Sequence, residues 1–338
     1  MTPVERLPVP RDRLGRPLRD LRLSVIEACN FRCGYCMPAD RVPEDYGFDS
    51  ASRLSFGELE TLVRAFVRLG VGKVRLTGGE PLLRKNLPDL IARVSGLAGL
   101  DDLTLTTNGS LLRAQARDLR QAGLGRLTIS LDALDTDVFA RMSGGRGRVA
   151  EVLAGIDAAV AAGFERIKIN CVVQRGVNED QILPLIAHFR GSGHVVRFIE
   201  YMDVGTRNGW RQEQMVPSAE LRARIAERWP LHPLDAQYRG EVAERYGFDD
   251  GAGEVGFVSS VSTPFCGDCH RARVSADGHL YTCLFAADGT DLKPALADGE
   301  EALAARLAQL WAQRADRYSE LRGRAASGKH VEMYLIGG

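Results

Sequence analysis

The sequence predicts an α/β protein in which six β/α units form a partly closed barrel, followed by a smaller region of a different kind. From residue 21 to about 205, short apolar runs alternate with amphipathic helical patterns. Such alternation builds a parallel sheet with right-handed crossovers. A doubly wound open sheet is the competing layout. In either layout the working residues lie at the carboxyl ends of the strands.

Six stretches have the composition of buried strands, namely 21–28, 73–78, 102–108, 126–132, 166–174 and 195–201. Helical patterns lie between them. Ser55 can cap a helix that Gly70 ends, and Glu58 can complete a capping box at its start. The stretch 148–162 repeats the apolar spacing of a helix and ends at Gly163.

The alternation stops after about residue 205, so we expect residues 1–215 to form the barrel and 216–338 an appended region. The appended region is predicted to hold a helix near 217–228, an irregular stretch with short strand-like runs to 285, and a helix near 300–322. The chain ends in a tail that closes with Gly337 and Gly338.

Charge and composition exclude several classes of protein. Formal net charge is zero, so no overall field points to nucleic acid or to a membrane surface. No apolar run of about 18 residues is present, and the N-terminus lacks the apolar segment of a secretion signal. We therefore expect a cytoplasmic protein. Seven cysteines in that reducing compartment indicate metal binding or catalysis rather than disulfides.

The first cysteine group directly follows the first predicted strand. Cys29, Cys33 and Cys36 place three thiolates within eight residues, enough to hold one [4Fe–4S] cluster while leaving one iron without a protein ligand. The alternative is a structural zinc site, but such sites usually have four ligands, and no fourth Cys or His is close in the sequence. Cys171 stands alone in an apolar strand and is read as a structural residue.

The next predicted strand ends in Thr77-Gly78-Gly79-Glu80-Pro81. Together with the cysteine spacing, this run resembles the S-adenosylmethionine (SAM) motif of the radical SAM superfamily. The resemblance implies that the open iron chelates SAM and that one electron cleaves it to a 5′-deoxyadenosyl radical. It also implies a barrel of the radical SAM type.

The second cysteine group comprises Cys266, Cys269 and Cys283. With His270 or His279 it could form a zinc site instead of a cluster. Arg271 and Arg273 follow closely, and residues two apart in an extended segment face the same way. Paired guanidiniums suit phosphate or carboxylate, so the group suggests a second open iron facing an anion.

Longer stretches narrow the resemblance to the GTP 3′,8-cyclase family, the molybdenum cofactor biosynthesis protein A type. The likeness runs from about residue 15 to 338. It includes CNFRCGYCMP, KVRLTGGEPLLRKNL, RFIEYMDVGTRNGW and GFVSSVSTPFCGDCHRARVSADGHLYTCLF. It implies conversion of GTP to 3′,8-cyclo-7,8-dihydroguanosine 5′-triphosphate, begun by abstraction of the ribose 3′-hydrogen, as a step of molybdenum cofactor synthesis.

The resemblance implies a role for each matching position. SAM would lie among Tyr35, Gly79, Ser130 and Met202. GTP would contact Arg22, Arg75, Thr106, Lys168, Arg271, Ala272 and Arg273. The catalytic set would be Arg271, Arg273, Gly337 and Gly338, and the two cysteine groups would hold two [4Fe–4S] clusters.

The residues themselves support these roles unevenly. Lys168 is one of only five lysines and interrupts an apolar run, which favours a functional role. Arg22 could be an exposed strand residue, and the Gly337-Gly338 tail could be a frayed terminus.

The resemblance also implies partners: an electron donor such as flavodoxin or ferredoxin, and a downstream cyclic pyranopterin monophosphate synthase. We expect a monomer or homodimer and no contact with nucleic acid or membrane. Two alternatives remain: another radical SAM enzyme with an auxiliary cluster, and a non-enzymatic metal-binding sensor.

Overall fold

The computed structural model of the chain describes residues 6–42, 44, 50–323 and 329–337. Its strands form one sheet in the order β12-β11-β10-β1-β2-β3-β4-β5-β6-β9-β8-β7. The six central strands are β1 (Asp20–Ser24), β2 (Lys73–Thr77), β3 (Asp102–Thr107), β4 (Arg126–Ser130), β5 (Lys168–Val173) and β6 (Val195–Glu200). They pair in parallel and in chain order, each inside one of the predicted stretches or within a residue of its start.

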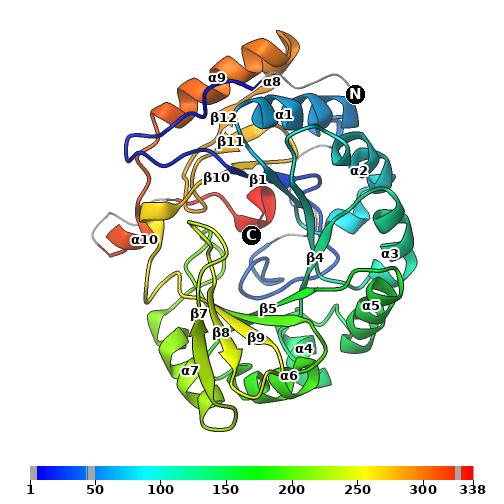
Figure 1. Cartoon of the computed structure of the whole chain (residues 1–338), viewed down its shortest axis with the longest axis vertical. Helices are drawn as coiled ribbons and strands as arrows, with labels where there is room; N and C mark the ends of the chain where they lie inside the picture. The colour runs from blue at the N-terminus through cyan, green and yellow to red at the C-terminus, as the bar shows by residue number, and fades with distance from the viewer. Residues whose placement is uncertain (1–5, 43, 45–49, 324–328, 338) are drawn as a thin grey trace.

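The helices between the strands lie along the outer side of the curved sheet, and the C-terminus lies in the middle of the ring (Figure 1). They are α1 (Phe56–Arg68), α2 (Leu87–Ser95), α3 (Leu112–Gln121), α4 (Thr136–Met142), α5 (Val149–Ala161) and α6 (Ile182–Phe189). Short 3₁₀ turns are η1 (Ser50–Ser52), η2 (Pro81–Leu83), η3 (Glu179–Gln181), η4 (Gln212–Gln214) and η5 (Cys266–Asp268). Because a doubly wound sheet carries helices on both faces, this arrangement confirms the barrel-like α/β fold.

Helix α1 starts as the sequence predicts. Ser55 and Glu58 form the capping box: the Glu58 backbone N–H donates to Ser55 Oγ at 3.3 Å, and Glu58 Oε2 accepts from the Ser55 backbone at 2.7 Å. The box supplies partners for backbone groups that a helix end leaves unpaired.

The C-terminal region is more regular than predicted. Helix α7 (Ser218–Ala226) is followed by β7 (Leu231–Leu234), β8 (Glu244–Phe248), β9 (Glu254–Val258), β10 (Arg271–Val274), β11 (His279–Tyr281) and β12 (Thr290–Asp291). Strand β9 pairs in parallel with β6, and β10 pairs in parallel with β1. The sequence region described as irregular therefore extends the barrel sheet at both edges. The boundary near residue 215 stays a prediction.

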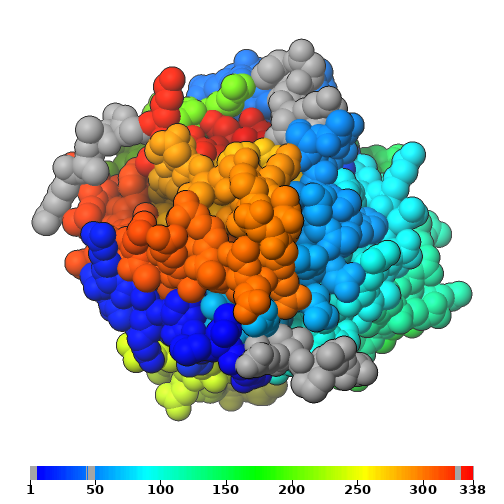
Figure 2. All heavy atoms as spheres, turned by 90° about the horizontal axis from the view of Figure 1, so that it is seen from above, coloured from blue at the N-terminus to red at the C-terminus, as the bar shows by residue number. Residues whose placement is uncertain are grey.

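The prediction of a single helix near 300–322 is wrong. After α8 (Lys293–Ala297), helix α9 (Glu300–Ala312) ends, and α10 (Tyr318–Leu321) begins only after five non-helical residues. In that gap Arg314 turns inward, where its side chain is 1% exposed and its Nη1 lies 3.2 Å from Asp12 Oδ2. Figure 2 shows α8 and α9 (orange) packed beside the N-terminal segment (dark blue).

The tail ends in α11 (Met333–Ile336), which buries Tyr334 and Ile336. Helix α11 contacts β1 in the middle of the ring, so the C-terminal residues lie among the central strands (Figure 1). Among the helices in the described ranges, none is both long and apolar enough to cross a membrane.

Candidate active site

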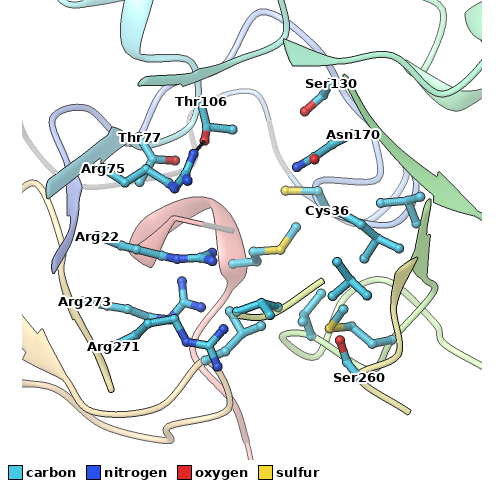
Figure 3. A pocket seen from close by; sticks show the side chains of 18 of the residues that line it. Arg22, Cys36, Arg75, Thr77, Thr106, Ser130, Asn170, Ser260, Arg271 and Arg273 are labelled. Carbon is cyan, nitrogen blue, oxygen red and sulfur yellow. Dashed lines mark hydrogen bonds between the residues drawn. The ribbon is translucent and has the colours of Figure 1, made fainter. Parts of the chain in front are cut away.

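Most of the predicted site residues line one cavity of about 320 Å³, the size range of small-molecule sites. Its wall includes Arg22, Cys29, Cys33, Tyr35, Cys36, Arg75, Gly79, Thr106, Ser130, Lys168, Met202, Cys266, Cys269, Arg271, Arg273 and Cys283. Figure 3 shows Arg22, Arg271 and Arg273 on one side, and Cys36, Ser130 and Asn170 on another. The two cysteine groups, about 230 positions apart in sequence, thus border the same space.

The first cysteine group follows β1. Cys29, Cys33 and Cys36 are half-buried, and burial raises the pKa of each thiol. The three thiols are close enough that each neighbouring sulfur raises the pKa of Cys33 further. Backbone N–H of Phe31 points at Cys29 Sγ from 3.4 Å. A cluster of soft thiolate ligands with N–H donors beside them fits a [4Fe–4S] site.

Gly78 and Gly79 are required by contact between two chain segments. A Cβ at Gly78 would collide with the backbone oxygen of Ile26, and one at Gly79 with that of Ala28. The Gly79 N–H donates to the Ile26 oxygen at 2.8 Å. The glycines therefore let the turn after β2 lie directly against the segment that leads to Cys29.

Glu80 is held by the chain itself. Its carboxylate accepts from Thr107 Oγ1 at 2.7 Å and from the backbone N–H groups of Asn108 at 2.7 Å and Leu82 at 3.0 Å. Burial raises the pKa of Glu80 to about 7, although these donors oppose the shift. Glu80 also lines the cavity, and its hydrogen bonds join the turn after β2 to the end of β3.

Tyr35 is fixed by a residue that the sequence did not single out. Its hydroxyl donates to Asp132 Oδ2 at 2.9 Å, and Asp132 Oδ1 accepts from the Val172 N–H at 2.8 Å. Burial raises the pKa of Asp132 to about 6. The position of Asp132 two residues after Ser130, just past the end of β4, was the only available signal.

The second cysteine group lies across the cavity. Arg271 Nη2 points at Cys269 Sγ from 3.1 Å, Arg314 Nη2 from 3.2 Å, and the Phe285 N–H at Cys283 Sγ from 3.5 Å. Burial raises the pKa of Cys269, but the charges of Arg271 and Arg314 outweigh it and lower the pKa to about 6. Three thiols with cationic donors aimed at sulfur fit a cluster of thiolate ligands.

No group of three or more His, Cys, Asp or Glu side chains with single-ion geometry occurs among the described residues. In a [4Fe–4S] cluster each thiolate binds a different iron, so the sulfurs need not converge on one point.

A row of three guanidiniums crosses adjacent strands. Arg22 on β1 is in register with Arg75 on β2 and with Arg273 on β10. Burial lowers the pKa of Arg22, and the neighbouring guanidiniums lower it further. Arg22 Nε is buried without a hydrogen-bond partner among the described residues. Like charges opposite one another are unfavourable, so the row is a built site for an anion.

Threonine hydroxyls on β3 and β4 hold the Arg75 end of this row. Arg75 Nη1 donates to Thr106 Oγ1 at 2.9 Å and to Thr128 Oγ1 at 3.0 Å. Burial lowers the pKa of Lys168 to about 7, and the charges of nearby arginines add to the effect.

Sequence reasoning missed further cations of the cavity wall, among them Lys73 and Arg197. Lys73 lines the cavity, and burial lowers its pKa to about 8. Arg197 also lines it; its Nη2 donates to Asn170 Oδ1 at 2.7 Å, and burial lowers its pKa to about 9. The rarity of lysine was a signal for Lys73, but arginine is too common here to mark Arg197.

Two predicted residues, Ala272 and Gly337, do not line the cavity. Ala272 is buried between Arg271 and Arg273 and points to the other face of β10, outside the cavity wall. Arg273 Nη1 donates to the backbone oxygen of Gly337. Gly337 has φ +72°, and a Cβ there would collide with Thr77 Cγ2. Gly338 lies outside the described residues.

Comparison with known proteins identifies the family. Residues 23–189 match the radical SAM superfamily model, and residues 194–320 match the model for Molybdenum Cofactor Synthesis C. A GTP 3′,8-cyclase of Xanthomonas axonopodis pv. citri is 71% identical over 329 residues, covering 97% of this chain and 98% of the relative. The chain belongs to the GTP 3′,8-cyclase family. A second GTP 3′,8-cyclase, from Acidothermus cellulolyticus, is 50% identical over 95% of the chain and 91% of its own length.

A solved structure supports the fold of this GTP 3′,8-cyclase family member. Streptococcus suis SuiB bound to S-adenosylmethionine superposes with a TM-score of 0.62 at 16% identity, over 92% of this chain and 69% of that one. At that identity the likeness concerns the fold alone. Membership of the radical SAM superfamily implies SAM and a [4Fe–4S] cluster.

Proposed function

We propose that this chain converts GTP to 3′,8-cyclo-7,8-dihydroguanosine 5′-triphosphate in molybdenum cofactor synthesis. The observation that carries this proposal is the register-aligned row Arg273, Arg22 and Arg75, facing the same cavity as two three-cysteine groups. A triphosphate is the ligand whose charge such a row matches. The relatives at 71% and 50% identity are GTP 3′,8-cyclases, which agrees with that ligand.

The proposed first cofactor site is held by Cys29, Cys33 and Cys36, with SAM among Tyr35, Gly79, Ser130 and Met202. A [4Fe–4S] cluster with an open iron supplies one electron to bound SAM. The chain's own residues orient the site. Asp132 restrains Tyr35, and the close approach at Gly78 and Gly79 fixes the cysteine loop against the β2 turn.

The proposed second site holds a [4Fe–4S] cluster on Cys266, Cys269 and Cys283, against which the guanine of GTP would lie. The triphosphate and ribose would contact Arg22, Arg75, Thr106, Lys168, Arg271 and Arg273, whereas the buried Ala272 between the last two faces away from the cavity. Cations buried without water bind an anion more strongly than the same cations on a surface. Fixing the nucleotide at both its base and its phosphates leaves the ribose between the two cysteine groups.

The tail would complete the catalytic set through Gly337 and Gly338, together with Arg271 and Arg273. Arg273 already donates to the Gly337 oxygen, which supports a role for the tail beside the phosphates. We also propose a small electron-transfer protein as reductant, and a downstream synthase that consumes the product to give cyclic pyranopterin monophosphate. The described cysteines are all free, which suits a reducing, cytoplasmic setting.

Anaerobic reconstitution tests the proposal. The loaded protein with dithionite, SAM and GTP should form 5′-deoxyadenosine and a pterin-yielding product together. Cys283→Ala should abolish the product, because the second thiol group would lose a ligand. Cys171→Ala is the matched control, since Cys171 is a buried thiol outside the cavity wall.

Two outcomes contradict the proposal at different levels. SAM cleavage that leaves GTP unchanged would retain the radical SAM chemistry and reject the substrate. No SAM cleavage despite about eight irons per chain, the content of two [4Fe–4S] clusters, would reject the chemistry itself.

A further inference from the structure

A buried charge triad lies behind the second cysteine group. Asp12 Oδ2 is 2.6 Å from Arg16 Nε and 3.2 Å from Arg314 Nη1. None of the three side chains is more than 2% exposed. Within the triad, two guanidiniums and one carboxylate leave one positive charge in excess, and the partly exposed Asp316, whose Oδ2 lies 3.4 Å from Arg314 Nε, offsets part of it. Buried charge groups of this kind seldom stabilise a fold more than apolar residues of the same volume would. A function for the excess charge is therefore the better account.

The excess charge faces the cysteines. Arg314 Nη2 points at Cys269 Sγ from 3.2 Å, and Arg314 Nη1 donates to the Cys269 oxygen at 2.7 Å. Arg16 Nη1 donates to the Cys266 oxygen at 2.7 Å. Both arginines line the cavity. The triad thus holds the backbone of two thiol-bearing residues and directs a cation at one sulfur.

One N–H donor group of Arg16 is unpaired in the part of the chain that the structure describes. Its Nη2 is buried and has no hydrogen-bond partner within the described ranges. A buried unpaired donor on a charged group is unfavourable for the fold. The sulfur atoms of a cluster held by Cys266 and Cys269 carry negative charge and would therefore be suitable acceptors for this donor.

Two segments that are distant in the sequence build the triad. Asp12 and Arg16 come from the N-terminal segment, and Arg314 from the gap between α9 and α10. Trp311 Nε1 donates to the Arg16 oxygen at 3.0 Å, and the Arg314 guanidinium lies 4.6 Å from the Trp311 ring centre. Arg314 Nε donates to the Thr282 oxygen at 3.0 Å, next to Cys283. Helix α9 ends at Ala312, and the non-helical residues that follow allow the Arg314 side chain to reach the thiol of Cys269.

We propose that Asp12, Arg16 and Arg314 are positioning residues that set the reduction potential of the cluster on Cys266, Cys269 and Cys283. The inference rests on the second cluster in the proposed function. Positive charge and N–H donors beside the sulfurs favour the reduced, more negative cluster and raise its potential. The Asp12 carboxylate offsets part of that charge and lowers the potential.

The test is specific because the arginine variants and the aspartate variant should shift the reduction potential in opposite directions. In the full chain carrying both clusters, redox titration followed by electron paramagnetic resonance measures each potential. Arg314→Gln and Arg16→Gln should each lower the potential of the second cluster, and Asp12→Asn should raise it. We expect about a tenfold change in the reduction equilibrium, which is about 59 mV for one electron. Loosened packing alone would move all three variants in the same direction.

The controls separate charge from packing. Arg190→Gln is matched to Arg314→Gln, because Arg190 also lies on a tryptophan ring, at 5.7 Å from that of Trp229, and lies outside the cavity wall. It should leave both potentials unchanged. The first cluster is the internal control in every sample, and a variant with Cys29, Cys33 and Cys36 replaced by Ala assigns the second signal.

Three results would overturn the inference. Potentials that stay unchanged in all three variants would remove the electrostatic role, and shifts of one sign would reassign the triad to packing. If the variant lacking the first cysteine group binds no cluster while Arg314 is intact, the proposed second cluster fails and the inference fails with it. If the Arg314→Gln variant does not assemble its clusters, Arg16→Gln and Asp12→Asn still test whether the reduction potential shifts in opposite directions.

Discussion

Burial perturbs the pKa values of single residues in this site most, and the neighbouring positive charges add to the shifts of Arg22 and Lys168. Arg22, Arg75 and Arg273 face one another across three strands, and burial leaves them little water to share. Sequence rules could find Lys168, because a lysine in an apolar strand is rare here. They could not find Arg197 or Asp132, because an arginine among 44 basic residues and an aspartate after a strand carry no distinguishing pattern. Only the register of the strands brings these groups together.

Lys168 should take up a proton when GTP binds. Burial and the charges of Arg197, Arg126, Lys73 and Arg75 lower its pKa to about 7, so at about pH 8 it is mostly neutral in the free protein. A bound triphosphate favours the charged amine and raises that pKa. Affinity for GTP should therefore fall as the pH rises from about 7 toward the pKa of the complex.

Calorimetry at about pH 8 in two buffers of different ionisation enthalpy measures this proton uptake. Lys168→Arg should reduce the uptake, because arginine is charged throughout this range. Lys293→Arg, outside the cavity wall, is the control. Uptake that is equal in Lys168→Arg and the unaltered chain would show that Lys168 is already charged before GTP arrives.

Helices and strands were predicted well where the sequence pattern repeats, and poorly where tertiary contacts decide their ends or positions. The six central strands and the α1 capping box follow from sequence alone. The end of α9 does not, because residues 313–317 contain neither Gly nor Pro, and the helix ends where Arg314 is drawn to Asp12 and Thr282. The tail element α11 likewise has its position set by contacts rather than by its own four residues.

Glu332 should hold α11 in the barrel. Its Oε1 accepts from Thr206 Oγ1 at 2.7 Å and from the Thr206 N–H at 3.0 Å. Hydrogen bonds to a charged group contribute about 1.5–3 kcal/mol, so Glu332→Ala should reduce the docked tail by about tenfold or more. Hydrogen exchange at 333–337 should quicken, and product formation should fall more than SAM cleavage.

Thr206→Val removes the hydroxyl from the other side and should give part of the same effect. Glu301→Ala, an exposed carboxylate in α9, is the control. If Glu332→Ala leaves exchange at 333–337 unchanged, the tail is held by Tyr334 and Ile336 alone.

At the scale of the whole molecule, the main hydrophobic core of the described residues runs through both predicted regions. The main cluster of buried side chains includes Phe198 of β6, Phe257 of β9 and Trp311 of α9. The rings of Phe198 and Phe257 are 6.1 Å apart. The α/β class and the six parallel strands could be read from the sequence, whereas the extension of the sheet beyond β1 and β6 could not. Strands of two to four residues, such as β12 and β10, are too short to show a clear period.

Because the core is shared, a cavity in the C-terminal region should loosen the barrel. Phe257 is fully buried, and Phe257→Ala should destabilise the chain by about 3–5 kcal/mol. Strand β9 pairs with β6, so hydrogen exchange should quicken at 195–200 as well as at 254–258. Phe139→Ala, in α4 and packed edge-on against Phe31, is the matched control within the barrel and should leave 254–258 unchanged. If Phe257→Ala quickens exchange only beyond residue 215, the two regions fold as separate units. If β6 follows β9, the cysteine groups are carried by one cooperative structure, and their separation across the cavity is as rigid as the sheet.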